Sequence, residues 1–94
     1  MEADRTLSWD WYPGTIPMNV EVDDSAYIET TYSFSMYRSE AQLGARIGKA
    51  ASTYIGTMLD VGPKGQVIIG DYALVVGVRI VCDARVEIGE PRLA

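Results

Sequence analysis

The side chains that could carry out catalysis are few, and none of them is a histidine. Without imidazole the chain cannot form a Ser-His or Cys-His nucleophile pair or a histidine-based zinc site. The remaining candidates are the carboxylates of Asp60, Asp71 and Asp83 as bases and the thiol of Cys82 as a nucleophile. An aspartate acts as a base near neutral pH only where burial or a like charge raises its pKa, and Asp83 next to Cys82 disfavours the thiolate. The residue types alone therefore predict no catalytic residue and no metal site.

Four polar side chains lie in two segments that interrupt the regular spacing of the chain. Tyr37 and Arg38 belong to the first segment. Asp60 and Lys64 belong to the second, where Gly-Pro and Lys-Gly steps predict a turn. Because loops often carry binding residues, we expect these four side chains to overhang a cleft and contact a substrate. The alternative is that both segments are corners that absorb extra residues.

Charge and composition exclude several classes of partner. The chain has a net charge of −5, and its first thirty residues hold seven acidic side chains against the one basic side chain of Arg5. Nucleic acids are poor partners for such a surface, because their affinity depends on Lys and Arg that neutralise phosphates. No apolar run approaches the ~20 residues of a membrane span, and no basic-then-apolar signal opens the sequence. The single cysteine is compatible with a reducing compartment, so we expect a cytoplasmic protein that binds neither nucleic acid nor membrane.

The elements that must position these residues follow a period of six. In three blocks of four hexads, the leading residue is apolar in every hexad except one, which begins with Thr. The leading residues are Ile16, Val22, Ile28 and Phe34, then Ala41, Ile47, Thr53 and Leu59, then Ile68, Leu74, Ile80 and Val86. On an α-helix a step of six advances the chain by about 600°, which scatters these residues over three faces. A coil built of three short strands, with one hexad on each side, would point all of them into one core.

A competing local pattern covers residues 39–52. Ser39-Glu-Ala-Gln42 matches a helix capping box, and an Ala-rich stretch follows it. Gly44 and Gly48 oppose a helix there by about 1 kcal/mol each relative to Ala. A short helix is therefore the alternative to strands in this stretch.

Three runs of hexads resemble a known family. The runs are Leu43-Gly-Ala-Arg-Ile47-Gly-Lys-Ala-Ala51, Ile69-Gly-Asp-Tyr-Ala-Leu-Val-Val-Gly-Val-Arg-Ile80 and Cys82-Asp-Ala-Arg-Val86-Glu-Ile-Gly-Glu90. Together they resemble the bacterial hexapeptide-repeat acyltransferase superfamily. The resemblance implies an all-β fold, a left-handed parallel β-helix over residues 16–94, and a homotrimer. It also implies three hexads in each coil, so the twelve hexads predict about four coils. It also implies acyl-CoA as co-substrate and acyl transfer to a small hydroxyl or amine acceptor.

The resemblance does not supply a catalytic residue. Members of the superfamily commonly use a histidine as general base, and no residue here matches it. Fold alone does not establish activity, so the alternative function is a non-catalytic structural or interaction protein that self-assembles or binds a partner.

Both ends of the predicted β-helix need a cover, because stacked coils end in unpaired strand edges. Residues 1–15 contain the densest aromatic cluster, Trp9-Asp-Trp-Tyr-Pro-Gly14. We expect this segment to be an N-terminal aromatic cap, although the same rings could stack on a base, a sugar or a cofactor. Near the other end, Ile88-Gly-Glu90 begins another hexad, and a protein partner at this open C-terminal coil is a further expectation.

Overall fold

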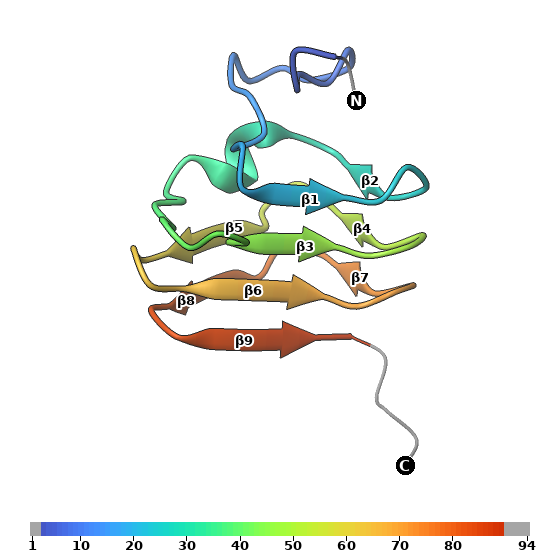
Figure 1. Ribbon diagram of the computed structural model, residues 1–94. Coiled ribbons are helices and arrows are strands. Elements are labelled where there is room, and N and C mark those ends of the chain that lie inside the picture. Colours follow the sequence, from blue (N-terminus) through green and yellow to red (C-terminus); the bar gives the residue numbers. More distant parts are fainter. Residues whose placement is uncertain (1–2, 90–94) are drawn as a thin grey trace.

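Short parallel strands wind through the chain as a β-solenoid of about three turns (Figure 1). The computed structural model describes residues 3–89. The elements are β1 (Val20–Val22), β2 (Tyr27–Ile28), the 3-10 helix η1 (Thr31–Phe34), β3 (Ala45–Ile47), β4 (Ser52–Thr53), β5 (Met58–Val61), β6 (Gln66–Ile69), β7 (Leu74–Val75), β8 (Arg79–Cys82) and β9 (Arg85–Ile88). They form three parallel sheets in the orders β1-β3-β6-β9, β2-β4-β7 and β5-β8. The predicted all-β, parallel β-helical fold is therefore confirmed.

Aliphatic residues that stack between coils hold the solenoid together. In the sheet β1-β3-β6-β9 two columns point inward. The columns are Val20, Ala45, Val67 and Val86, and Val22, Ile47, Ile69 and Ile88. The four members in the two middle strands are fully buried. Each large aliphatic side chain buried in this way contributes about 1.5–3 kcal/mol, and none could be buried by a single coil.

The number of coils differs from the prediction of about four. The stacked residues Val22, Ile47 and Ile69 are 25 and 22 residues apart, whereas three plain hexads would take eighteen. Turns therefore use the additional residues, and η1 replaces a strand on one side of the first coil. The same number of residues consequently completes fewer turns.

Most of the predicted inward residues of the first two blocks lie in or against the core, Ala41 excepted, and the third block is partly wrong. Ile16, Ile28 and Phe34 of the first block and Ile47, Thr53 and Leu59 of the second are buried, whereas Val22 and Ala41 are half-buried. In the third block Leu74 is 68% exposed and Val75 is 3% exposed, so the prediction for Leu74 is wrong. The prediction for Ile68 is wrong in the same way, because its neighbours Val67 and Ile69 are the fully buried residues of β6. Side chains alternate between the two faces of a strand, and a shift of one residue therefore reverses every assignment.

The alternative of a helix over residues 39–52 is also wrong, because this stretch contains β3 and the first residue of β4 and forms no helical turn. The Ser39 hydroxyl accepts a hydrogen bond from the Ala41 amide (3.2 Å) and not from the Gln42 amide that a capping box would use. The same hydroxyl donates to the Gly65 carbonyl in the next coil (2.7 Å). Contacts between coils therefore outweigh the local helix pattern.

The close packing of coils at a corner can be tested at Gly62. The Asp83 carboxylate lies over Gly62 and accepts a hydrogen bond from the Lys64 amide (3.0 Å). A Cβ atom at position 62 would lie 2.5 Å from Asp83 Oδ1. We expect Gly62→Ala to lower the free energy of unfolding by about 1–3 kcal/mol, because the added methyl group overpacks the corner.

Urea denaturation of a double-mutant cycle distinguishes this clash from a general intolerance of the turn. All three neighbouring atoms belong to the Asp83 side chain, and without its carboxylate the nearest remaining atom is Cβ, 3.3 Å away. Asp83→Ala should therefore remove most of the cost of Gly62→Ala, with a coupling energy of about 1 kcal/mol or more. Additive effects of the two substitutions would contradict the proposed contact.

The N-terminal segment lies across one end of the solenoid, at the top of Figure 1. Leu7 and Ile16 are buried in the hydrophobic core, and the Trp9 indole donates to the Ile28 carbonyl (3.0 Å). The division into a cap of residues 1–15 and a coil domain of residues 16–94 stays a prediction, and residues 1–2 and 90–94 lie outside the described part. Across residues 3–89, no helix has the length and apolar character needed to cross a membrane.

Candidate functional site

The three outer faces of the solenoid differ in chemistry. The sheet β1-β3-β6-β9 carries ion pairs, such as Arg46–Glu21 (3.1 Å). The outer side of β2-β4-β7 carries aromatic and aliphatic residues, which we call the uncharged face: Tyr27, Tyr54, Leu74 and Val76, with Trp9 stacked on Tyr27 at a ring distance of 5.6 Å. The β5-β8 face carries a cluster of two arginines around one aspartate. This arginine cluster is the candidate site.

Three successive coils build the arginine cluster. Asp60 lies on β5, Arg79 lies on β8, and Arg38 follows η1 with its amide bonded to the Val61 carbonyl (2.8 Å). Arg38 Nη2 donates to Asp60 Oδ1 at 3.3 Å, and Arg79 Nη2 donates to Asp60 Oδ2 at 2.7 Å. The Asp60 side chain is 9% accessible, whereas those of Arg38 and Arg79 are 63% and 62% accessible. One covered carboxylate therefore orients two exposed guanidinium groups.

The charge state of Asp60 decides what this cluster can do. The hydrogen bond from Arg79 is the main cause that lowers the pKa of Asp60; burial opposes it, and Arg38 adds to the lowering. Asp60 is therefore ionised and a poor proton acceptor at neutral pH. Each guanidinium donates one hydrogen bond to Asp60, and its other N–H groups can donate to solvent or to a ligand. The cluster has one more positive than negative charge, which suits it to an anion.

The structure brings two of the four predicted site residues together. Arg38 and Asp60 form an ion pair. Tyr37 lies apart from them: its hydroxyl donates to Asn19 Oδ1 (2.9 Å), and its ring contacts Phe34 edge to face. Burial raises the pKa of Tyr37, although hydrogen bonds with Ser39 and Asn19 oppose it. Lys64 lies exposed at the turn between β5 and β6, and the substrate-binding role of all four residues stays a prediction.

Sequence reasoning missed Arg79. Asp60 follows the leading residue Leu59, and Arg79 precedes the leading residue Ile80. Leu59 and Ile80 are partners in the parallel pairing of β5 with β8. The spacing of hexads does not show which of them stack, since each turn takes a different number of additional residues, and so the pairing had to come from the fold.

The other candidate reactive groups are Asp71, Asp83 and Cys82, and the two carboxylates have structural roles. Asp71 Oδ1 accepts from the Lys49 amide (2.8 Å), in the same way that Asp83 accepts from the Lys64 amide. Both carboxylates are thus turn-stabilising groups at corners. Cys82 is a free, half-buried thiol near the last coil. These contacts offer no pairing of a nucleophile with a base.

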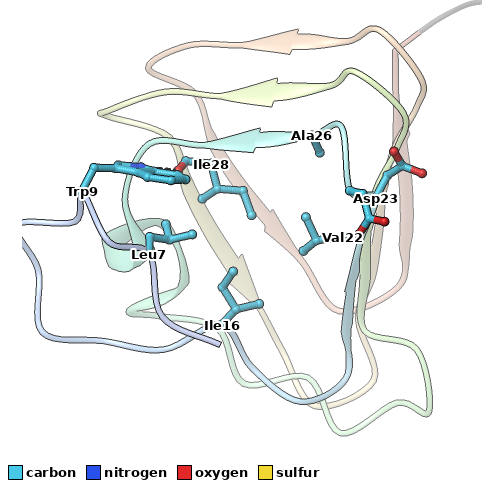
Figure 2. A pocket seen from close by; sticks show the side chains of 8 residues that line it. Leu7, Trp9, Ile16, Val22, Asp23, Ala26 and Ile28 are labelled. Atoms are coloured by element: carbon cyan, nitrogen blue, oxygen red, sulfur yellow. Dashed lines mark hydrogen bonds between the residues drawn. The ribbon is translucent and has the colours of Figure 1, made fainter. Parts of the chain in front are cut away.

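A hollow of about 100 Å³ lies between the N-terminal segment and the first coil (Figure 2). It is lined by Leu7, Trp9, Ile16, Val22, Asp23, Asp24, Ala26 and Ile28. Figure 2 shows mostly apolar side chains around it, with Trp9 and Asp23 on opposite sides. Binding sites for drug-sized ligands or cofactors measure about 300–1,000 Å³, so this hollow is a gap in packing.

Comparisons with protein-family models, curated proteins and solved structures found no match. The functional conclusion therefore depends on the fold and on the geometry of the arginine cluster.

Proposed function

We propose that this chain is an acyltransferase-like β-solenoid that binds an acyl-CoA donor. The observation that carries the proposal is the pair of guanidinium groups of Arg38 and Arg79, both oriented by Asp60. Coenzyme A is rich in phosphate, and guanidinium groups bind phosphate through charge-assisted and often bidentate hydrogen bonds. The parallel β-solenoid supports the proposal, because the hexapeptide-repeat acyltransferase superfamily that the sequence resembles has a fold of this kind.

The proposal places donor binding, rather than proton transfer, on this chain. No histidine is present among the 94 residues, and the lowered pKa of Asp60 makes it unsuited to deprotonate an acceptor. Acyl transfer to a small hydroxyl or amine then depends on a base that a partner supplies. An acyl-CoA donor and a free thiol both favour a cytoplasmic location, which is part of the same proposal.

A second candidate is a non-catalytic protein that acts by assembly. The uncharged face favours it, because Tyr27, Leu74 and Val76 are exposed on a flat sheet of an otherwise acidic chain. Aromatic residues are enriched and charged residues depleted at the centres of protein interfaces. Side-by-side association of this face would give the homotrimer that the resemblance implies.

Calorimetric titration with coenzyme A tests the donor-binding proposal. We expect the unchanged chain to bind, and we expect Arg38→Gln and Arg79→Gln each to weaken binding by about tenfold or more. A hydrogen bond to a charged group contributes about 1.5–3 kcal/mol, which corresponds to at least that factor. Arg46→Gln is the matched control, because Arg46 is also an exposed, ion-paired arginine but lies on another face. Dephospho-coenzyme A reports whether the 3′-phosphate contributes, and inorganic sulfate reports whether a small anion alone binds.

Two results would contradict donor binding at this site. An unchanged chain that gives no binding heat at millimolar coenzyme A would exclude the proposal and leave the assembly function. Equal weakening by Arg46→Gln and Arg79→Gln would show a general charge effect instead of a site.

A further inference from the structure

The gap in packing between the N-terminal segment and the first coil is too small for a drug-sized ligand, but it has room for the head group of a smaller molecule. Its volume is about 100 Å³. A dry cavity of about 150 Å³ takes a benzene molecule, which has six carbon atoms. By the same ratio this hollow takes about four non-hydrogen atoms, which is the size of a trimethylammonium group.

The lining of the hollow combines an aromatic ring, apolar side chains and negative charge. Trp9 and Asp23 lie on opposite sides of it (Figure 2), and Asp24 also belongs to the lining. Among residues 3–89, no basic side chain lines the hollow. Trp9 and Asp24 are both exposed, so a ligand can reach it from solvent. The apolar part of the lining consists of Leu7, Ile16, Val22, Ala26 and Ile28.

Both carboxylates of the lining can interact with a positive charge. Ser25 donates to Asp23 Oδ2 through its amide (3.0 Å) and its hydroxyl, and within residues 3–89 Oδ1 accepts no hydrogen bond. The hydroxyl bond is the main cause that lowers the pKa of Asp23; the amide bond adds to it, and burial opposes them. Asp23 is therefore ionised at neutral pH. Asp24 is exposed, and no ion pair occupies its carboxylate within the same residues.

A quaternary ammonium group suits this lining better than a primary ammonium group does. A primary ammonium carries three N–H donors and is strongly hydrated, and apolar walls offer no acceptors in place of the lost water. A trimethylammonium group has no N–H donor, and its methyl groups form an apolar surface. Aromatic rings attract such cations through the negative charge on their faces, and tryptophan does so most strongly.

We propose that the hollow beneath Trp9 binds the trimethylammonium group of a small organic cation, with the carboxylates of Asp23 and Asp24 as its counter-charges. The Trp9 ring is fixed in place, because its indole donates to the Ile28 carbonyl (3.0 Å) and its ring stacks on Tyr27. A bound cation joins the N-terminal segment, which supplies Trp9, to the first coil. The site is separate from the arginine cluster, so the proposal does not rest on coenzyme A binding.

Titration of the 94-residue chain with choline, followed by tryptophan fluorescence, tests the proposal. A Trp11→Phe background leaves Trp9 as the sole tryptophan. We expect a saturable change with a Kd of about 1–10 mM, because a head group of so few atoms supports only weak binding. The neutral isostere 3,3-dimethylbutan-1-ol has carbon in place of the ammonium nitrogen and should bind about fivefold more weakly or worse. Sodium chloride at equal concentrations is the control for ionic strength.

Charge variants test the two carboxylates. Asp24→Asn should weaken choline binding about threefold, whereas Asp4→Asn, which removes a charge of the N-terminal segment outside the lining, should leave it unchanged. Adding Asp23→Asn should weaken it further, and its amide oxygen can still accept from Ser25. Lys49→Gln should strengthen binding, because the positive charge of Lys49 also acts on Asp23.

Three results would overturn the proposal. The first is a fluorescence change at tens of millimolar choline that is no larger than the change with sodium chloride. The second is equal binding of choline and its neutral isostere, which would show no preference for a cation. The third is equal weakening by Asp24→Asn and Asp4→Asn. Arg79→Gln should leave choline binding intact, and loss of binding in that variant would also contradict a separate site.

Discussion

Replacing Ile69 by Asp is expected to abolish cooperative folding, whereas the same replacement at Ile68 is expected to leave the fold intact. Ile69 is fully buried in the inward column between Ile47 and Ile88. Truncating such a residue to Ala costs about 2–5 kcal/mol, and an unpaired carboxylate in the same place costs more. Small domains are stable by about 5–15 kcal/mol in total, so Ile69→Asp removes a large part of that margin.

Ile68 is the matched control because it is the adjacent residue on the same strand. It is half-buried and points outward between Arg46 and Glu87, where an added carboxylate is solvated. We expect Ile68→Asp to change the free energy of unfolding by less than about 1 kcal/mol. Far-ultraviolet circular dichroism with urea denaturation measures both variants. The reverse order of effects would show that the inward and outward residues of β6 have been exchanged.

Replacing Asp10 by Ala is expected to lower the free energy of unfolding by about 2–4 kcal/mol and to detach the N-terminal segment. The Asp10 carboxylate accepts hydrogen bonds from the Thr30 hydroxyl (2.7 Å), the Thr31 amide (2.9 Å), the Thr31 hydroxyl and the Tyr12 amide (3.0 Å). Thr30 and Thr31 are 1% exposed, so their donors would lose a partner that water cannot easily replace. Each unsatisfied buried group costs about 1–3 kcal/mol.

The control for this prediction is Asp4→Ala in the same segment. Asp4 is exposed, and within residues 3–89 its carboxylate accepts hydrogen bonds from Thr6 alone, so its removal should matter little. Detachment would uncover Leu7 and the hollow beneath Trp9, and binding of a hydrophobic dye by Asp10→Ala would report it. Equal stability of the Asp10→Ala and Asp4→Ala variants would contradict the role of Asp10.

The same contacts predict how stability depends on pH. Burial raises the pKa of Asp10, but the hydrogen bonds from Thr31 and Thr30 outweigh burial and lower it below the ordinary value of 3.8. A carboxyl group with a depressed pKa in the folded state stabilises the fold above its unfolded value, and this stabilisation is lost as the pH falls through its folded value. The free energy of unfolding should therefore decline as the pH falls below about 3.8. In acid denaturation, the Asp10→Asn variant should show a smaller decline than the unchanged chain.

Much of the fold could be predicted from local spacing, and the errors have a common cause. Ile28, Thr53 and Leu59 were correctly placed in the core, because a period of six is compatible with strands and not with one face of a helix. Leu74 was placed inward although Val75 is the buried neighbour. A turn that gains or loses one residue exchanges the inward and outward side chains of the whole following strand. Residue types alone do not show that such a change has occurred.

The candidate site was less predictable than the fold. Arg38 and Asp60 were identified as polar residues at interruptions of the hexads, and they meet in space. Arg79 completes the cluster from a strand that looked regular. Tyr37 is adjacent to Arg38 in the sequence, but its hydroxyl donates to Asn19, and its amide closes the turn to the Phe34 carbonyl.

Two properties of the sequence by itself determined the outline of this protein. The six-residue period predicted the β-solenoid, and the absence of histidine excluded imidazole chemistry. Only the tertiary structure decided which residues stack and which side chains form the arginine cluster. The physical reason is that hexads specify inward and outward positions along one strand, whereas the pairing of Leu59 with Ile80, and thus of Asp60 with Arg79, depends on the length of every turn between them.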